Sequence, residues 1–391
     1  MAPAGRRVLV RVDFNVPLDG GRVTDDLRLE ASLLTIQRLR DAGARLVLMS
    51  HLGRPEGRVV EELRLAPVAE RLAELAGAPV AAARDVVGDD ARGRADALAD
   101  GEVLLLENLR FHPGEEANDD GFADALAALG DAYVNDAFGA AHRAHASVVG
   151  VPARVERAVA GELLAGELRA LSRLLEDPPR PFCAVLGGAK VSDKLGVIDN
   201  LLGRVDRLLI GGAMCFTFLR ARGLDVGDSR VETDRLDGVR RLLDAAEAGG
   251  VQVHLPADVV VAEEFSPQAE ARPVPADEIP EGTMGLDVGP DTVVRFATAI
   301  ADAGAVLWNG PMGVFEWEEF RAGTEGVARA VAACAGFTVI GGGDSAAAIR
   351  QLKLADQVNH VSTGGGAALE YLEGAELPGV AALRGDGSVR G

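Results

Sequence analysis

The chain has 391 residues, of which 48% are hydrophobic. A chain of this length is too long for one ordinary hydrophobic core, so we expect two domains. A net charge of −20 at pH 7 argues against nucleic acid or an anionic membrane as a partner. No segment approaches the roughly 18 uninterrupted apolar residues of a membrane span, and the N-terminus lacks the apolar stretch of a signal peptide. We therefore expect a cytoplasmic protein that binds small molecules and keeps its three cysteines reduced.

Short apolar runs alternate with amphipathic stretches along the whole chain. In the first half, strands are predicted at 8–12, 46–49, 103–106 and 132–134, and helices at 27–42, 66–76 and 122–129. In the second half, strands are predicted at 184–186, 208–210, 251–254, 305–308 and 338–340, and helical stretches follow most of them. This alternation indicates an α/β fold with two doubly wound domains, each a parallel sheet covered by helices on both faces.

The best candidate for a domain boundary is a helical segment from about residue 161 to residue 176. It is followed by Asp177-Pro178-Pro179-Arg180-Pro181, and prolines at this spacing end a helix and begin a new unit. We expect residues 1–160 to form the first domain, 161–180 a linking helix and hinge, and 181–376 the second domain.

Lysine is rare in this chain, and its positions are informative. Only three of the 40 basic side chains are lysines, and two of them, Lys190 and Lys194, follow the pair Gly187-Gly188. An ammonium group is a point donor that can follow a moving oxyanion, whereas guanidinium prefers a flat bidentate partner. Because residues 181–186 read as a buried strand, the order of strand, glycine turn, lysine and helix predicts an anion site. The alternative is a tight turn with two solvated lysines.

Two more glycine turns, 340–345 and 360–366, follow apolar runs in the second half. Glycines let backbone N–H groups approach a polyphosphate, Ser345 can cap or donate, and Asp344 can hold a magnesium ion. Neither GxxxxGK[ST] nor GxGxxG occurs, so the pattern predicts nucleotide binding by another scheme. The alternative for each turn is an ordinary capped helix start.

The turn at 308–316 also follows a predicted strand. There Glu316 could accept hydrogen bonds from a ribose, while Pro311 and Val314 could wall an adenine. Without further context, an ordinary exposed glutamate remains the alternative for Glu316.

Basic residues gather at helix starts and strand ends in the first half: Arg28, His51, Arg54, Arg110 and Arg143. Carboxyl ends of parallel strands share one edge of a sheet, so these side chains are expected to converge and bind a small, doubly charged anion. Asp13 and Asn15 would then read a hydroxyl group of that anion. The alternative to such an anion site is that these arginines are ordinary surface residues exposed to solvent. His142 and His145 have no carboxylate or cysteine partner at metal-ligand spacing, so we expect no metal there.

Taken in order, these segments resemble the motifs of the phosphoglycerate kinase family, and the resemblance covers nearly the whole chain. The segments that carry it are 11–17, 50–55 and 135–145 in the first half and 187–194, 308–317, 341–345 and 362–366 in the second. The resemblance implies a glycolytic and gluconeogenic enzyme that transfers a phosphoryl group reversibly between 1,3-bisphosphoglycerate and ADP, giving 3-phosphoglycerate and MgATP. It also implies a monomer that closes about a hinge, with the tail 377–391 packed back on the first domain.

The resemblance assigns roles residue by residue. The glycerate substrate would be bound by Asp13, Phe14, Asn15, Arg28, His51, Leu52, Gly53, Arg54, Arg110 and Arg143. The nucleotide would be bound by Gly188, Ala189, Lys190, Lys194, Gly211, Gly212, Gly285, Leu286, Asn309, Pro311, Val314, Glu316, Gly342, Gly343, Asp344 and Ser345, with Asp344 at magnesium. The catalytic residues would be Arg28, Lys190, Gly343 and Gly366.

The chemistry read from the residues agrees with this assignment. When ATP is consumed, the nucleophile is a carboxylate that is already ionised at neutral pH, so no general base is needed. Alignment and charge neutralisation remain, and lysine, arginine, magnesium and turn amides supply both. Two other classes stay open: an NAD-dependent oxidoreductase, which lacks GxGxxG, and a non-enzymatic binding protein for phosphorylated acids, which would not need Lys190.

Overall fold

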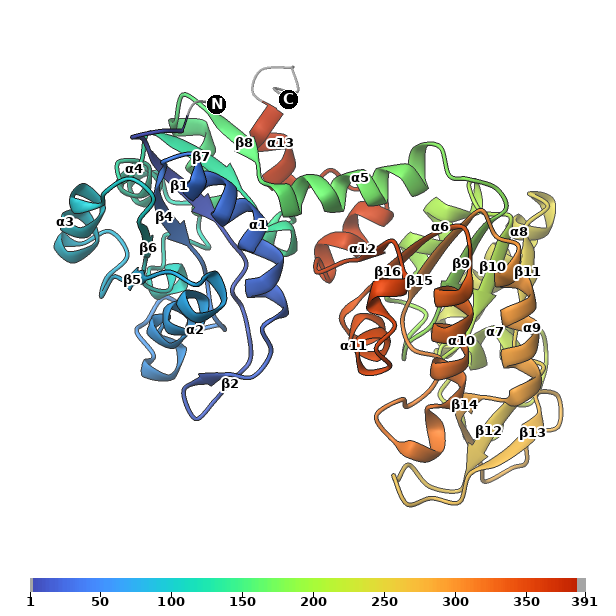
Figure 1. Ribbon diagram of the computed structural model, residues 1–391. Coiled ribbons are helices and arrows are strands. Elements are labelled where there is room, and N and C mark those ends of the chain that lie inside the picture. Colours follow the sequence, from blue (N-terminus) through green and yellow to red (C-terminus); the bar gives the residue numbers. More distant parts are fainter. Residues whose placement is uncertain (1–2, 385–391) are drawn as a thin grey trace. The chain divides into compact units, whose positions relative to one another are not determined.

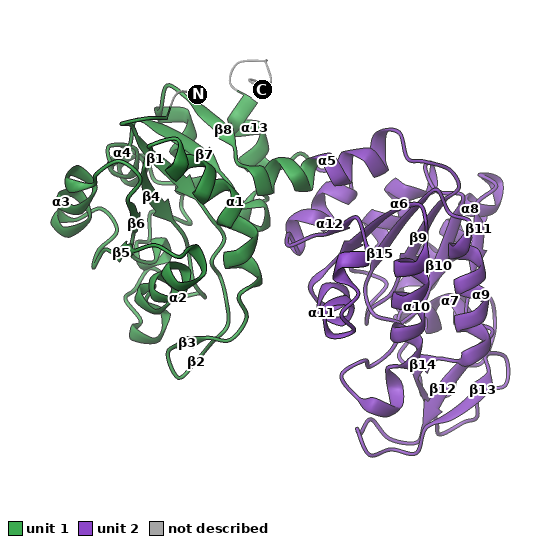
Figure 2. Ribbon diagram, viewed as in Figure 1, with its two compact units in different colours: residues 1–168, 376–391 green, residues 169–375 purple. Residues whose placement is uncertain are grey.

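The computed structural model describes residues 3–384, and the chain divides into two compact units (Figures 1 and 2). One unit comprises the chain up to residue 168 together with the segment from residue 376 onward, and the other comprises residues 169–375. The division falls within the helix α5 (Glu162–Glu176), the segment that the sequence marked as a link. Among residues 3–384, no helix is both long and apolar enough to cross a bilayer.

The first unit is built on a six-stranded sheet in the order β5-β6-β4-β1-β7-β8, and all neighbouring strands run parallel. The strands are β1 (Arg7–Arg11), β4 (Arg45–Met49), β5 (Val80–Ala82), β6 (Val103–Leu105), β7 (Ala132–Asn135) and β8 (Ala158–Ala160). The helices are α1 (Leu27–Asp41), α2 (Ala66–Ala76), α3 (Asp89–Ala97), α4 (Asp120–Ala127) and α13 (Pro378–Arg384). Short elements complete it: β2 (Leu18–Asp19), β3 (Arg22–Val23), η1 (Glu61–Leu63), η2 (Leu109–Phe111), η3 (Phe138–Ala140), η4 (Ala146–Gly150) and η5 (Pro152–Arg154).

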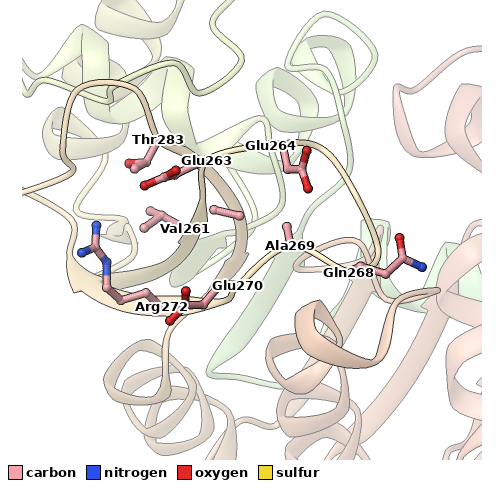
Figure 3. Close-up of a pocket in the computed structure, with 9 residues that line it drawn as sticks. Val261, Glu263, Glu264, Gln268, Ala269, Glu270, Arg272 and Thr283 are labelled. Atoms are coloured by element: carbon pink, nitrogen blue, oxygen red, sulfur yellow. The ribbon is translucent and has the colours of Figure 1, made fainter.

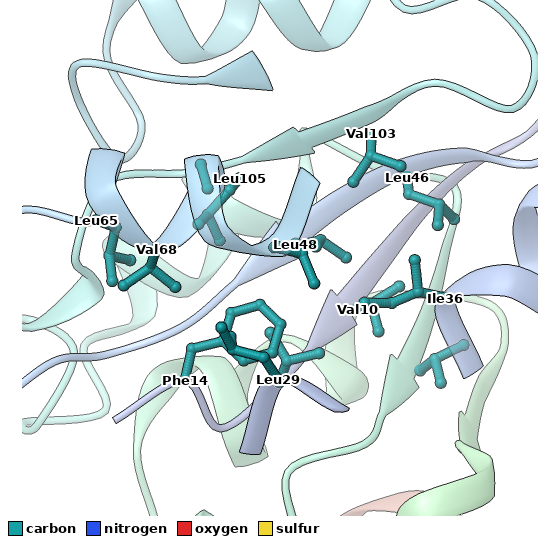
Figure 4. Close-up of a cluster of buried hydrophobic side chains, with 14 of the residues drawn as sticks. Val10, Phe14, Leu29, Ile36, Leu46, Leu48, Leu65, Val68, Val103 and Leu105 are labelled. Carbon is teal, nitrogen blue, oxygen red and sulfur yellow. The ribbon is translucent and has the colours of Figure 1, made fainter. Parts of the chain in front are cut away.

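Alternation along the central strand explains why helices cover both faces of this sheet. Successive side chains of a strand point to opposite faces, so Val8 and Val10 of β1 lie on one face and Leu9 lies on the other. The Val10 face packs against α1 and α2 through residues such as Leu29 and Val68 (Figure 4). The Leu9 face packs against α3 and α4. The three middle residues of β1 are therefore apolar, as in a parallel strand buried on both faces, and arginines stand at its two ends.

The chain returns to this unit at its C-terminal end, as expected. Gly379 in α13 donates its backbone N–H to the carbonyl of Ala141 at 2.8 Å, and a Cβ at this glycine would lie 2.6 Å from Val148. A larger residue at 379 would therefore force α13 away from the turn beneath it. The expected tail continues to residue 391, and 385–391 lie outside the described residues.

The second unit repeats the plan with a parallel six-stranded sheet in the order β11-β10-β9-β15-β16-β17. Its strands are β9 (Phe182–Leu186), β10 (Arg207–Ile210), β11 (Gln252–His254), β15 (Ala305–Asn309), β16 (Phe337–Gly341) and β17 (His360–Val361). Its helices are α6 (Leu195–Leu202), α7 (Cys215–Ala221), α8 (Leu236–Ala248), α9 (Pro290–Ala301), α10 (Ala322–Ala333), α11 (Gly343–Gln351) and α12 (Gly366–Leu372), with η6 (Thr233–Arg235), η7 (Glu318–Phe320) and η8 (Ala355–Gln357).

A second, antiparallel sheet in this unit was not predicted. Its strands, in the order β13-β12-β14, are β12 (Asp258–Ala262), β13 (Arg272–Pro275) and β14 (Met284–Val288). The edge strand β13 contains Pro273 and Pro275, and prolines at an edge are compatible with a strand but read as a loop in sequence. The prediction of two doubly wound parallel sheets is confirmed, and this small sheet is added to it.

Both sheets reverse their strand order at one point, and such switch points place loops around a crevice. In the first unit the reversal lies between β1 and β7, and in the second between β9 and β15. The motifs singled out in the sequence follow these four strands or their neighbours. The fold therefore collects them at the carboxyl edge of each sheet.

Candidate functional site

The first unit brings most of the predicted basic residues together at the carboxyl edge of its sheet. We define Arg28, His51, Arg54, Arg110 and Arg143 as the basic cluster. Arg28 of this cluster forms an ion pair with Asp13 in the loop after β1, and Arg110 donates to the carbonyl of Gly53 at 2.7 Å. Gly53 in turn donates its N–H to the side chain of Asn15 at 2.9 Å. Three loops are thereby tied into one surface.

His51 is almost fully buried within this surface, and several positively charged side chains lie near it. Burial lowers its pKa well below the ordinary value, and the charges of Arg11, Arg110 and Arg28 act in the same direction. Burial also lowers the pKa of Arg110; the carboxylate of Glu116 opposes this shift, and the charges of Arg11 and Arg143 add to it. Such an accumulation of positive charge is costly without an anion, so the cluster is suited to bind one.

Two predicted substrate residues lie differently from the others. Phe14 and Leu52 have exposed fractions of 0% and 2%, and both side chains belong to the same hydrophobic core, in which Figure 4 shows Phe14. Only their backbone groups can face a ligand. In contrast, Arg54 and Arg143 are exposed and available for a ligand.

The second unit contains a cavity of about 460 Å³ at the carboxyl edge of its sheet. The predicted nucleotide residues that line it are Gly188, Ala189, Gly212, Gly285, Leu286, Pro311, Val314, Glu316 and Asp344. Loops after β9, β10, β15 and β16 supply most of these residues, whereas Gly285 and Leu286 lie within strand β14. Five separate segments of the sequence therefore meet around one hollow, and four of them follow parallel strands.

Close backbone approach explains why glycine is needed in this wall. Gly212 has φ of +62°, and a Cβ there would lie 2.4 Å from the backbone nitrogen of Gly188. Its N–H donates to the carbonyl of Met312 at 3.0 Å, and Gly188 donates to Pro311 at 3.0 Å. Any side chain at 212 would separate the three loops and open the cavity.

The remaining predicted nucleotide residues form the floor and rim beside this cavity. Lys194 donates to the side-chain oxygen of Asn309, and Ser345 accepts the N–H of Gly310 at 2.6 Å. Gly342 precedes α11 with φ of +86°, and Gly343 opens that helix with free space around its Cβ position. Lys190 and Gly343 are exposed. Gly211 packs against Met312 and contributes structure rather than a free surface.

Several residues of this cavity were not predicted. Phe265 lines it although 64% of the residue is exposed, and its ring lies 4.5 Å from that of Trp317. Asp287 lines it with only 3% exposed, and accepts the N–H of Gly323 at 2.7 Å. Burial raises the pKa of Asp287 to about 7. The sequence offered a signal for Phe265, an aromatic residue in the polar stretch 263–268.

Another hollow, of about 450 Å³, lies on the small antiparallel sheet (Figure 3). It is lined by Glu263, Glu264 and Glu270, with Arg272 as its one basic residue. Three carboxylates around one guanidinium do not favour a polyphosphate. The cavity at the carboxyl edge of the parallel sheet is therefore the better candidate for an anionic ligand.

Within residues 3–384, no group of three or more histidine, cysteine or acidic side chains is placed to hold a metal ion. Asp344 is a single exposed carboxylate at the start of α11, beside the cavity. This arrangement fits Mg²⁺ that takes most of its oxygen ligands from phosphates and water, as Mg²⁺ usually does.

Two doubly wound units, one with a basic cluster and the other with a glycine-walled cavity, define a two-domain α/β phosphotransferase. The family model described as phosphoglycerate kinase matches residues 1–375. A phosphoglycerate kinase of Thermomicrobium roseum is 60% identical, and the match covers 97% of this chain and 96% of that protein. A phosphoglycerate kinase of Synechococcus elongatus is 56% identical, and the match covers 97% of this chain and 95% of that protein. The solved phosphoglycerate kinase of Coxiella burnetii has a TM-score of 0.88 at 42% identity, covering 98% of this chain and 97% of its own. The chain belongs to the phosphoglycerate kinase family.

Proposed function

We propose that the protein transfers a phosphoryl group reversibly from 1,3-bisphosphoglycerate to ADP, giving 3-phosphoglycerate and ATP in glycolysis and gluconeogenesis. The observation that carries the proposal is the identity of 60% to a phosphoglycerate kinase over 97% of the chain; the basic cluster in one unit and the glycine-walled cavity in the other support it. The family expectation for such a protein is a cytoplasmic monomer whose partners are its small-molecule substrates.

The basic cluster of the first unit binds the glycerate substrate in this proposal. Arg54 and Arg143, which are exposed, hold the phosphate of 3-phosphoglycerate, because guanidinium groups bind phosphate through paired hydrogen bonds. Asp13 and Asn15 bind the hydroxyl side of the molecule. The reacting carboxylate then lies near Arg28, whose positive charge is held in place by Asp13.

The cavity of the second unit binds the nucleotide. Leu286, Pro311 and Val314 give it an apolar wall suited to adenine, with Phe265 at its mouth, and Glu316 accepts hydrogen bonds from ribose. The phosphates extend to the start of α11, where the N–H groups of Gly343 and Asp344 and the helix dipole favour negative charge. Lys194 and Asn309 lie below that turn.

Asp344 would hold Mg²⁺ together with the nucleotide phosphates. When bound, the ion neutralises phosphate charge and draws electrons from the leaving group. Residues of the chain stabilise the transferring phosphoryl group itself. Lys190 and Arg28 neutralise the three oxygens of the transferring group, and the N–H groups of Gly343 and Gly366 donate to them.

The proposed domains are residues 1–160 with the tail from 377, a link at 161–180, and 181–376. Substrates that bind to different domains can react only after domain closure, which places donor and acceptor in line and excludes water. The carboxylate attacks the γ-phosphorus directly, so no covalent enzyme intermediate forms.

A coupled assay tests the proposal. Purified protein with MgATP is supplied with 3-phosphoglycerate, and the product is reduced by glyceraldehyde-3-phosphate dehydrogenase at the expense of NADH. Turnover that requires 3-phosphoglycerate supports the proposal. Folded protein that binds ATP yet shows no turnover, at low and at molar salt and with the coupling enzyme verified in each, would remove it.

A further inference from the structure

A chain of buried hydrogen bonds runs beneath the basic cluster and ends on His51. It consists of Glu115, Ser147, Arg11 and His51, of which the first three are 0% exposed and His51 is 7% exposed. Ser147 donates its hydroxyl to Glu115 at 2.6 Å and accepts from Arg11 Nε at 2.8 Å. Arg11 Nη2 lies 3.0 Å from His51 Nδ1. None of the first three residues was predicted to belong to the site.

The local fold explains why Arg11 reaches this position. Arg11 is the last residue of β1, and alternation along that strand places its side chain on the face of Leu9. Ser147 lies in η4 on the same face, and Tyr133 donates to the carbonyl of Ser147 at 2.8 Å. A third bond, from Arg11 to the carbonyl of Val12, completes the guanidinium's contacts. The side chain is thus held on three sides.

This geometry determines the tautomer of His51. Guanidinium is protonated at all accessible pH values and can only donate, so the Nδ1 atom that it contacts must accept. In a neutral imidazole the proton then resides on Nε2, which becomes the donating nitrogen of the ring. Protonation of Nδ1 would remove the bond and place two cations in contact.

Glu115 stabilises the buried guanidinium through the intervening hydroxyl. It accepts the backbone N–H of Ser147 at 3.0 Å in addition to the hydroxyl, so both of its oxygens receive a proton donor from one residue. Burial raises the pKa of Glu115, while the charge of Arg11 and the two bonds from Ser147 oppose that rise. Arg11 is fully buried, and its guanidinium reaches the carboxylate of Glu115 through the hydroxyl of Ser147, so loss of Glu115 would remove a compensating charge from a buried cation.

We propose that Glu115 and Arg11 are positioning residues that act in series through Ser147 to hold His51 as a neutral ring with its proton on Nε2. In this form His51 donates one hydrogen bond to the anionic substrate without adding a charge that must be desolvated. The inference deepens the proposed function and rests on it, because it assigns His51 to the glycerate site. It predicts that the ring nitrogen used by the substrate is fixed before binding.

The other charged groups that face His51 favour the same state. Arg28 and Arg110 from the loops beside it lower its pKa, and so does His145, whose Nδ1 lies 3.9 Å from Glu115. Burial, the three arginines and His145 therefore all lower the pKa of His51, although carboxylates also stand near, Asp13 on Arg28 and Glu115 beside His145. A neutral His51 is expected across the whole range from about pH 5 to about pH 8, where free histidine titrates.

The test uses the intact protein labelled with ¹⁵N in its six histidines. Long-range proton–nitrogen spectra identify the protonated ring nitrogen, and loss of a signal in His51→Gln assigns the resonance. In the unmodified protein we expect one form, Nε2–H, throughout the pH range. In Arg11→Ala and in the milder Ser147→Ala we expect a share of the other tautomer or of the protonated ring.

Kinetics supply a second readout. Ser147→Ala is expected to raise KM for 3-phosphoglycerate about tenfold, the equivalent of one charge-assisted hydrogen bond, with KM for ATP unchanged. The matched control is Asp258→Asn, which alters a buried carboxylate that accepts from Thr292 in the other unit. It should change neither the His51 spectrum nor KM for 3-phosphoglycerate.

A proton on Nδ1 in the unmodified protein would overturn the inference. So would an unchanged His51 spectrum in both Arg11→Ala and Ser147→Ala, or an equal rise of KM in the Asp258→Asn control. The spectra require no turnover. If the unmodified protein failed to use 3-phosphoglycerate, the proposed function would fall while the spectra would still decide the state of His51.

Discussion

The ammonium group of Lys194 donates a hydrogen bond to the side-chain oxygen of Asn309, at a position where only 9% of the lysine is exposed. Burial lowers the pKa of Lys194, with Asp193 and Asp344 opposing that effect. The bond also fixes the orientation of the amide, because its oxygen faces the lysine. The Nδ2 atom of Asn309 is then a buried donor with no hydrogen-bond partner among residues 3–384, and it lies next to the glycine turn at 341–342.

An unpaired buried donor beside a phosphate-binding turn is suited to bind a phosphate oxygen. Asn309→Asp keeps the shape but replaces that donor with an acceptor and adds a negative charge, so ATP affinity should fall about tenfold or more. Calorimetric titration with MgATP measures it. The control is Asn359→Asp, because the oxygen of Asn359 already acts as an acceptor for Thr338. Equal ATP affinity in Asn309→Asp and the unmodified protein would contradict the assignment.

Lys190 should affect the reaction more than binding. It is exposed and follows the glycine pair after β9, so Lys190→Ala is expected to bind both substrates while kcat falls by about a hundredfold or more. Steady-state kinetics combined with equilibrium binding separate the two effects. Lys353→Ala removes the one lysine outside the motif and serves as the control. An unchanged kcat in Lys190→Ala would exclude Lys190 as a group that stabilises the transferring phosphoryl.

Gly343 permits a test of the phosphate site that leaves the fold intact. A Cβ at 343 would meet no atom within 4 Å, and the backbone is helical, so Gly343→Ala should not lower the free energy of unfolding. The added methyl group would occupy the space assigned to phosphate, and KM for ATP should rise at least several-fold. Gly203→Ala, which also has free space around its Cβ position, should change neither quantity. Normal nucleotide kinetics in a folded Gly343→Ala would place the phosphates elsewhere.

The raised pKa of Asp287 leads us to expect that the stability of the protein depends on pH. Burial raises its pKa to about 7 from an ordinary value of 3.8, so the folded state binds a proton that the unfolded state has released between those values. The free energy of unfolding should therefore fall as pH rises from about 4 to about 7, by at most ~1.4 kcal/mol for each pH unit. Below that range the stabilisation is fully present, and above it the stabilisation is lost.

Tryptophan fluorescence can follow this effect in one unit, because Trp308 and Trp317 both lie in residues 169–375. Urea unfolding is measured at several pH values for the unmodified protein and for Asp287→Asn. The variant loses an acceptor and should be less stable, but its stability should vary less with pH. Parallel pH profiles for the two proteins would show that Asp287 does not titrate in this range.

Much of the fold follows from local sequence patterns. The strand predicted at 181–186 and the helix predicted at 66–76 are apolar or amphipathic over enough residues for periodicity to define them; the helix has the predicted bounds, and the strand begins one residue later, at Phe182. The strand at 80–82 was missed because it has three residues and no fully buried position. The helix at 89–97 was missed because aspartate and arginine fill most of it and only two alanines are buried.

The sequence pattern by itself indicated site residues in loops that follow strands, whereas site residues inside strands were assigned only through the family resemblance or were missed. Lys190 and Arg54 stand in loops next to glycine, where function is readily inferred. Arg11 and Asp287 lie inside the strands 7–11 and 284–288, so a local pattern treats them as part of the sheet. Their partners, Ser147 and Gly323, lie 136 and 36 residues away along the chain, and only the folded structure brings each pair together.

The most direct test of the account is the fate of the γ-phosphoryl group itself. ATP carrying ¹⁸O at its three non-bridging γ-oxygens is incubated with the protein and 3-phosphoglycerate, and the products are examined by ³¹P NMR. With direct transfer, all three labelled oxygens should appear in the acyl phosphate, and omission of 3-phosphoglycerate should leave ATP intact. Release of labelled inorganic phosphate at the same rate without 3-phosphoglycerate would show water to be the acceptor and would contradict direct transfer.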